Sequence, residues 1–237
     1  MSTINLLFQK QYAINDSIKI IIPTVGQIID NEDDYYGLVS MLTAMPIDLI
    51  AQLDDAGIDF SSINEYDLFL IMFPAIQSHD TSMVFGDLDL TKFKMVINNQ
   101  NDNIVLLNEE ENIVIDRLIH SQIAAVLRKI HHIERNNRRP ANKEAKEYMI
   151  ERAHEKMRRK SRKEESQLES LIIAMVNTEQ YKYDFERTRE LSIYQFNESV
   201  RQVIKKVDYD NKMYGVYTGN INAKELSQDE LNWLTHK

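Results

Sequence analysis

Two acidic residues in the segment FGDLDL have the spacing best suited to metal chemistry in this sequence. Asp87 and Asp89 are two residues apart, which would place both carboxylates on one side of a strand. Paired carboxylates of this kind can hold Mg²⁺. A clear third acid is missing, however, and such acids also occur routinely in turns and at strand edges. We therefore expect no metal site here, and an enzyme that uses this pair is the least favoured function.

The histidines were considered next as metal ligands or acid–base groups. His120 and His131 are eleven residues apart, so they share a helix face but are separated by about three turns. One zinc ion cannot span that distance, and we predict partly exposed helix histidines. His79 and Asp80 lack a Ser or Cys partner motif, and no phosphate-binding loop, dinucleotide fingerprint or H-E-x-x-H occurs. These patterns predict a protein that is not an enzyme and needs no cofactor.

The elements that must position any site are mostly helical. The chain has 237 residues, 43% of them hydrophobic, with only 6 Gly, 4 Pro and no Cys. Two short strands between residues 4 and 22 flank a polar turn at 15–17 and predict a hairpin. Three β-rich runs between 92 and 116 predict a meander, and most of the rest reads as helix. The predicted fold is α+β and predominantly α-helical.

Three Ser or Thr residues have the spacing of a capping box, which predicts a helix start. They are paired as Thr24 with Gln27, Ser62 with Glu65, and Ser192 with Gln195. The helix that begins at Thr24 could continue to about Pro46, with a break at Gly37 left open. A separate helix that begins at Pro46 would end at Gly57. Residues 168–176 predict a buried helix. Ser227 and Glu230 predict a final short helix.

Charge is distributed unevenly along the chain, whose formal net charge is -9. Residues 1–116 carry a net charge of -15, residues 117–163 of +10 and residues 164–237 of -4. We therefore predict an acidic α+β unit over 1–116 and a helical unit with a basic arm over 117–237. A single shared core remains the alternative. The sequence lacks the pattern of a secretion signal and any apolar run of membrane-spanning length, so we expect a soluble protein.

The basic stretch from Arg138 to Glu165 has three interpretations. Nucleic-acid binding is not favoured, because no helix-turn-helix, zinc pattern or interleaved aromatic residues accompany the charge. A solvated helix would explain the acidic start and basic end through the helix dipole. An arm that docks on another copy or on an acidic partner would explain the thin Ala/Met stripe. The candidate partner-binding residues are Met149, Met157, Arg158, Arg159, Arg162, Phe196 and Arg201.

Several longer segments carry a resemblance to a known group of proteins. They include IPTVGQIID, DLFLIMFP, FGDLDLTKF, RRPANKEAKEYMIERA and LSIYQFNESVRQVIKKV. The chain resembles a family encoded in the tail-morphogenesis region of tailed phages and prophages of Gram-positive bacteria, which is similar to phage tail assembly chaperones. The resemblance covers nearly the full length.

The resemblance implies a non-enzymatic morphogenesis factor, most specifically a chaperone that binds the tape measure and tail tube proteins in the host cytoplasm. It also implies a homo-oligomer. The alternatives are a structural virion component, such as a connector or baseplate protein, and a nucleic-acid-binding accessory protein.

Overall fold

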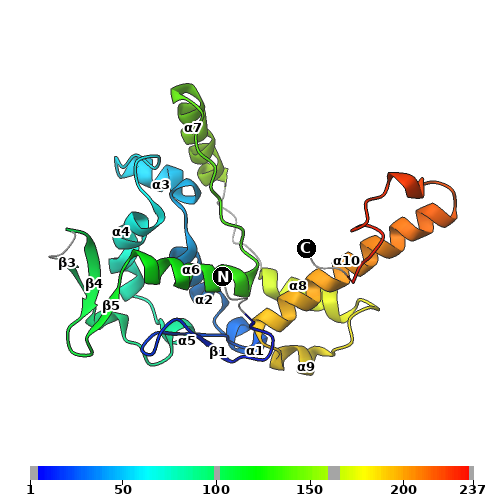
Figure 1. The fold of residues 1–237 in the computed structure, drawn as a ribbon, viewed down its shortest axis with the longest axis horizontal. Helices are drawn as coiled ribbons and strands as arrows, with labels where there is room; N and C mark the ends of the chain where they lie inside the picture. Colours follow the sequence, from blue (N-terminus) through cyan, green and yellow to red (C-terminus); the bar gives the residue numbers. More distant parts are fainter. Residues whose placement is uncertain (1–4, 99–101, 160–165, 235–237) are drawn as a thin grey trace.

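The computed structural model describes residues 5–98, 102–159 and 166–234. It is a predominantly helical α+β fold with two small antiparallel sheets, which confirms the predicted fold class (Figure 1). The first sheet is a hairpin and the second is a three-stranded meander. The meander lies at the left edge of the molecule, the hairpin lies along the bottom, and one long helix extends from the body at the C-terminal side (Figure 1).

The N-terminal hairpin pairs β1 (Gln11–Ala13) with β2 (Lys19–Ile21). The predicted turn is confirmed, because the Asn15 side chain accepts hydrogen bonds from the backbone N–H groups of residues 17 and 18. The first predicted strand was wrong, since residues 5–10 form no strand. Leu6 is fully buried in the main core, so this apolar run serves packing instead of strand pairing.

The predicted helix after Thr24 is two helices, α1 (Val25–Ile29) and α2 (Glu32–Thr43). The capping box at its start is confirmed, but the break falls at residues 30–31 and not at Gly37. Three consecutive acids open α2, where the dipole favours negative charge and supports a new start. A 3₁₀ turn, η1 (Pro46–Leu49), and α3 (Ile50–Asp55) follow. Gly57 then has φ +70°, as expected for a helix end.

Helix α4 (Glu65–Gln77) begins at a cap that the sequence prediction placed two residues too early. The Asn64 side chain accepts from the N–H groups of Tyr66 and Asp67, and the Asp67 carboxylate accepts from the Asn64 N–H. Ser62 instead donates its hydroxyl to the Asp59 carbonyl. Helix α5 (Ser82–Phe85) and the 3₁₀ turn η2 (Leu90–Lys92) complete this region.

The predicted meander is confirmed. It is formed by β3 (Lys94–Ile97), β4 (Ile104–Asn108) and β5 (Ile113–Ile115), paired in that order. The next helix, α6 (Arg117–His131), crosses the middle of the molecule (Figure 1). Its apolar face is buried at Ile123, Val126 and Ile130, and the helix packs on α2, α4 and β5.

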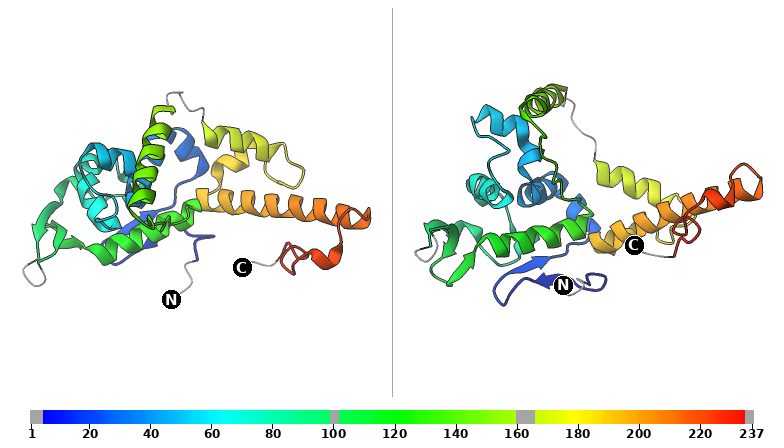
Figure 2. Two further views of the ribbon diagram at one scale, coloured as in Figure 1. Left: turned by 90° about the horizontal axis from the view of Figure 1, so that it is seen from above. Right: turned by 45° about the horizontal axis from the view of Figure 1, so that its top comes forward.

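The remaining helices are α7 (Lys143–Arg159), α8 (Gln167–Val176), α9 (Phe185–Glu190) and α10 (Ile193–Tyr217), with a short 3₁₀ turn η3 (Ala223–Glu225). Figure 2 shows α10 leaving the body as a long rod. The C-terminal segment folds back on it, where Gln202 donates to the Trp233 carbonyl at 3.1 Å. Ser227 and Glu230 form the predicted reciprocal hydrogen bonds, but only a turn follows.

The burial predicted for α8 was wrong. Only Leu168 and Met175 are buried, and Ile173 is 49% exposed. Helix α8 is held instead at its start, where Ser166 and the Leu168 N–H both bind the Glu32 carboxylate of α2. The apolar composition of this segment therefore exceeds what its own fold covers.

Two segments that are distant in sequence are joined by backbone pairing. Thr24 and Ser192 form an isolated β-bridge, flanked by backbone hydrogen bonds from Val25 N–H to Leu191 and from Ile193 N–H to Pro23, each 2.9 Å long. The capping box at Ser192 is confirmed. The division of the chain at residue 116 stays a prediction. In the structure α6 contacts both α10 and the N-terminal elements.

Candidate partner-binding site around the basic helix

The basic helix α7 lies on the acidic part of its own chain and is not an extended arm. It packs beside α3 (Figure 1, Figure 2). Half-buried Met149, Ile150 and Ala153 contact a small apolar cluster separate from the main core. The buried members of this second cluster, which we call the α3–α7 cluster, are Ile50, Leu53, Phe60 and Leu68.

Two ionic contacts fix α7 at its ends on α3 and the following loop. Lys146 Nζ lies 2.5 Å from the Asp59 carboxylate, and His154 Nε2 lies 2.8 Å from that of Asp54. The hydrogen bonds from Lys146 and then Ser61 lower the pKa of Asp59 to about 2. Part of the basic character of α7 is therefore matched by acidic residues of the same chain.

The segment that leads into α7 is held by a buried ionic network. Residues 132–142 form neither helix nor strand. Arg135 binds one oxygen of Glu65 at 2.7 Å, and buried Arg128 of α6 binds the other at 2.6 Å. Asn136 donates to Asp48 at 3.2 Å. The first half of the segment is therefore anchored, and residues 137–140 line a cavity with Met45, Pro46 and Phe60 before α7 begins.

An open groove of about 710 Å³ lies between α2, α3 and the C-terminal half of α7. We call it the α2–α7 groove. Its apolar lining includes Tyr36, Ile47, Ile133 and Met157, and Lys156 stands with Met157 on the α7 side. Glu134 and Asp48 supply acidic groups at its other margins. The groove is open and of mixed polarity. It therefore suits several side chains of another protein better than a small molecule.

Part of the predicted partner-binding set meets at this groove. Met157 is 46% exposed and lines it, while Arg158 and Arg159 are exposed on the last turn of α7. Arg159 lies 3.8 Å from Glu155 of the same helix. Met149 faces inward onto the α3–α7 cluster. Arg162 lies outside the described residues.

The other two predicted residues lie elsewhere. Phe196 is fully buried in the main core, where it packs edge-on against Tyr181, so it presents no surface to a partner in this fold. Arg201 is exposed on α10 and binds Glu198 at 2.6 Å. The sequence could not separate these residues from the α7 set. A capped amphipathic helix has the same pattern whether its apolar face meets a partner or its own core.

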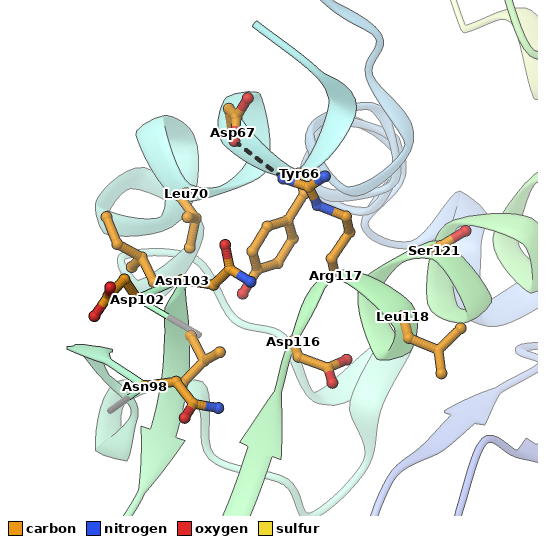
Figure 3. Close-up of a pocket in the computed structure, with 12 residues that line it drawn as sticks. Tyr66, Asp67, Leu70, Asn98, Asp102, Asn103, Asp116, Arg117, Leu118 and Ser121 are labelled. Carbon is orange, nitrogen blue, oxygen red and sulfur yellow. Dashed lines mark ion pairs between the residues drawn. The ribbon is translucent and has the colours of Figure 1, made fainter. Parts of the chain in front are cut away.

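A second cavity, of about 620 Å³, lies where α4, the β3–β4 hairpin and α6 meet (Figure 3). Asp67 and Arg117 face each other across it at 3.9 Å. The Tyr66 hydroxyl donates to the Ile115 carbonyl at 2.8 Å, and Asp116 caps α6 by accepting from the Ile119 N–H. These polar groups hold neighbouring elements together.

The histidines are more buried than the sequence predicted. His120 is fully buried and stacks on Phe69 with the ring centres 4.2 Å apart, and burial lowers its pKa to about 4. Nε2 of His131 and the Tyr35 hydroxyl are hydrogen-bonded at 2.9 Å, and burial lowers the pKa of His131 to about 4. Both imidazoles are neutral at pH 7 and act as packing groups. His132 is exposed.

The predicted strand that would carry Asp87 and Asp89 is not formed. Asp89 instead precedes η2 and accepts from the Thr91 N–H and hydroxyl, and these hydrogen bonds lower its pKa. Within residues 5–98, 102–159 and 166–234, no group of three or more His, Asp or Glu side chains could hold a metal ion. Among these same residues, no helix combines the length and apolar character needed to cross a membrane.

Comparison with known families finds one match. A family model described as the YomV second domain matches residues 159–237, the region that contains α8, α9, α10 and η3. The family name derives from a Bacillus phage, which is consistent with a phage protein. No curated protein and no solved structure shows a significant match. The match covers the C-terminal third, so the α7 site lies almost entirely outside it.

Proposed function

We propose that this protein is a non-enzymatic phage morphogenesis factor, most specifically a tail assembly chaperone that binds the tape measure and tail tube proteins. The phage-derived family name supports the phage context. The resemblance of the sequence to tail-morphogenesis proteins supports the narrower role. In the cavity where α4 and α6 meet, the Tyr66 hydroxyl and the Asp116 carboxylate are engaged in structural hydrogen bonds, which favours binding over catalysis.

The observation that carries the proposal is the position of Met157 in the α2–α7 groove, next to Arg158 and Arg159. Methionine adapts to varied partner surfaces, because its side chain is flexible and polarizable. Exposed arginines nearby add contacts that salt weakens. A chaperone that coats a long helical partner and then releases it needs this combination of shallow apolar contact and screened charge.

The test is a pull-down of the tagged protein co-expressed with the tape measure and tail tube proteins of its own genome, after nuclease treatment. Wild type is compared with an Arg158→Glu, Arg159→Glu, Arg162→Glu variant. A control variant, Lys182→Glu, Arg187→Glu, Lys224→Glu, makes the same change of charge on exposed residues far from α7. We expect wild type and control to capture a tail protein and the α7 variant to lose most of it. Failure of wild type to capture either protein contradicts the proposal.

A structural virion protein is the second candidate, because the outer half of α10 carries large exposed aromatic side chains. Tyr214 is 72% exposed and Tyr217 is 87% exposed, on a helix that extends from the body (Figure 2). Such groups are enriched in permanent subunit contacts. Purified virions separate the two functions, since a chaperone is absent from them and a connector or baseplate protein is present.

A further inference from the structure

We infer that α7 occupies, in its own chain, the docking site for an amphipathic helix of the partner, and that binding displaces it. The inference rests on the proposed function: Met157, Arg158 and Arg159 of α7 make the first contact with the partner, and a helix of the partner then takes the place of α7 on α3. The site is the α3–α7 cluster together with Asp54 and Asp59.

Helix α7 is held to the rest of the fold by few contacts. None of its residues in the described range 143–159 is buried. Its apolar contacts go only to the small α3–α7 cluster, whereas the large core forms without it. Of the two contacts that hold it, Lys146–Asp59 is an ion pair between partly exposed side chains and is therefore screened by salt, and His154–Asp54 is a partly exposed hydrogen bond.

The connection before α7 allows the helix to move. Arg135 and Asn136 anchor the incoming segment to Glu65 and Asp48, as described above. Residues 137–142 then run to the helix without regular structure. Six such residues span up to about 20 Å when extended. The helix can therefore leave α3 while the buried Arg128–Glu65 pair stays intact.

The contacts of α7 define the chemistry of the helix that would replace it. Basic groups eight positions apart, Lys146 and His154, meet the two carboxylates. Between them Met149, Ile150 and Ala153 supply a small apolar face. A partner helix with Lys or Arg at positions i and i+8, and small or flexible apolar residues at i+3, i+4 and i+7, would make the same contacts. This is the helix-in-groove mode of recognition.

The first experiment uses α7 itself as the probe. A fluorescently labelled peptide of residues 142–159 is titrated into three full-length proteins, with anisotropy as the readout. Lys146→Glu with His154→Glu opens the site by reversing both contacts with α3. Lys143→Glu with Arg152→Glu is the matched control, since these exposed residues pair only within α7 in the described contacts.

The opened variant is expected to bind the peptide at least about 10-fold more tightly than wild type or control. In wild type, α7 fills the site in most molecules. The peptide can bind only to the fraction of molecules in which α7 has left, and this lowers its apparent affinity. A folded opened variant that binds no better than wild type overturns the inference. Circular dichroism verifies that the variant is folded, and where it is not, the cross-linking experiment decides.

The second experiment locks α7 in place. The sequence contains no Cys, so Asp54→Cys and His154→Cys introduce the only thiols. A short bismaleimide joins them, and the same variant capped with N-ethylmaleimide is the control. We expect the cross-linked protein to bind no peptide and to capture less tail protein than the capped protein, which carries the same two substitutions. Equal capture by both forms overturns the inference and leaves the proposed function intact.

The two proposals fail in different ways. If wild type captures no tail protein, the proposed function fails, while peptide binding by the opened variant still supports a displaceable helix. If the opened variant self-associates in light scattering and captures no tail protein, the site receives α7 of a second copy. That result overturns the partner helix as its occupant.

Discussion

The guanidinium of Arg128 lies 2.6 Å from the carboxylate of Glu65, and each side chain is only 9% exposed. The same Arg128 nitrogen donates to the Thr43 carbonyl at 2.5 Å, and Arg135 binds the second Glu65 oxygen at 2.7 Å. One carboxylate thus connects α4 with α6, the end of α2 and the segment before α7. The pair therefore forms part of the fold, and α7 is attached to it through the chain.

Replacing Arg128 with Met is expected to lower the free energy of unfolding by about 3–5 kcal/mol, because it leaves a buried carboxylate with one cation fewer. Arg135→Met should cost about 1 kcal/mol or less, since the Arg135 side chain is half exposed. Urea denaturation of both variants gives the comparison. Equal losses of unfolding free energy in the two variants would mean that the buried Arg128 contributes no more to stability than the half-exposed Arg135.

Acidic pH is expected to destabilise the fold through its neutral histidines. The pKa of His120 is about 4 in the folded chain, below its usual value of about 6.5 because the ring is buried. The unfolded chain therefore binds more protons between these values. Stability is full above pH 6.5 and falls toward pH 4, by up to about 1.4 kcal/mol per pH unit for this residue. His120→Gln should flatten the slope in that window, whereas exposed His79→Gln should not.

The corrected cap of α4 gives a prediction with an internal control. Asn64→Ala is expected to cost about 1 kcal/mol, because the side chain satisfies two N–H groups at the helix start. Ser62→Ala, at the position that the sequence favoured, should cost less, since that hydroxyl binds only an exposed carbonyl. Thermal or urea unfolding measures both. A larger loss at Ser62 would restore the original assignment.

Two glycines in neighbouring helices should respond to alanine in opposite directions. A Cβ at Gly26 would lie 2.5 Å from the Arg189 side chain and 3.1 Å from its carbonyl oxygen, so overpacking should cost about 1–3 kcal/mol. Gly37 lies within α2 with open space around it, so Gly37→Ala should stabilise the fold by about 0.5–1 kcal/mol. Unfolding curves of the two variants measure both changes in stability. Changes of the same sign would contradict the close packing of Gly26 on Arg189.

Local patterns predicted the elements whose contacts are local. The caps at Thr24 and Ser192 depend on residues three positions away, and the turn at Asn15 on residues two and three away, so all three were visible in the sequence. The strand expected at residues 4–8 and the burial of α8 failed because both depend on distant packing. Leu6 is buried by the tertiary core, and α8 is covered on one side only.

The candidate site was predictable in composition but not in position. The stripe on α7 was identified, yet its use inside the chain depends on Asp54 and Asp59, about a hundred residues earlier. No periodicity in α7 indicates those partners. The α2–α7 groove likewise arises from three segments that are distant in sequence, and only the tertiary fold brings them together.

The bridge between Thr24 and Ser192 also constrains the order in which the molecule can be made. A ribosome releases residue 24 long before residue 192 exists, so the pairing of Thr24 with Ser192 must wait until most of the chain has been synthesised. Contacts this distant slow folding. Nascent chains stopped before α9 and α10 would leave an incomplete core exposed, and we expect aggregation or proteolysis of such fragments during expression.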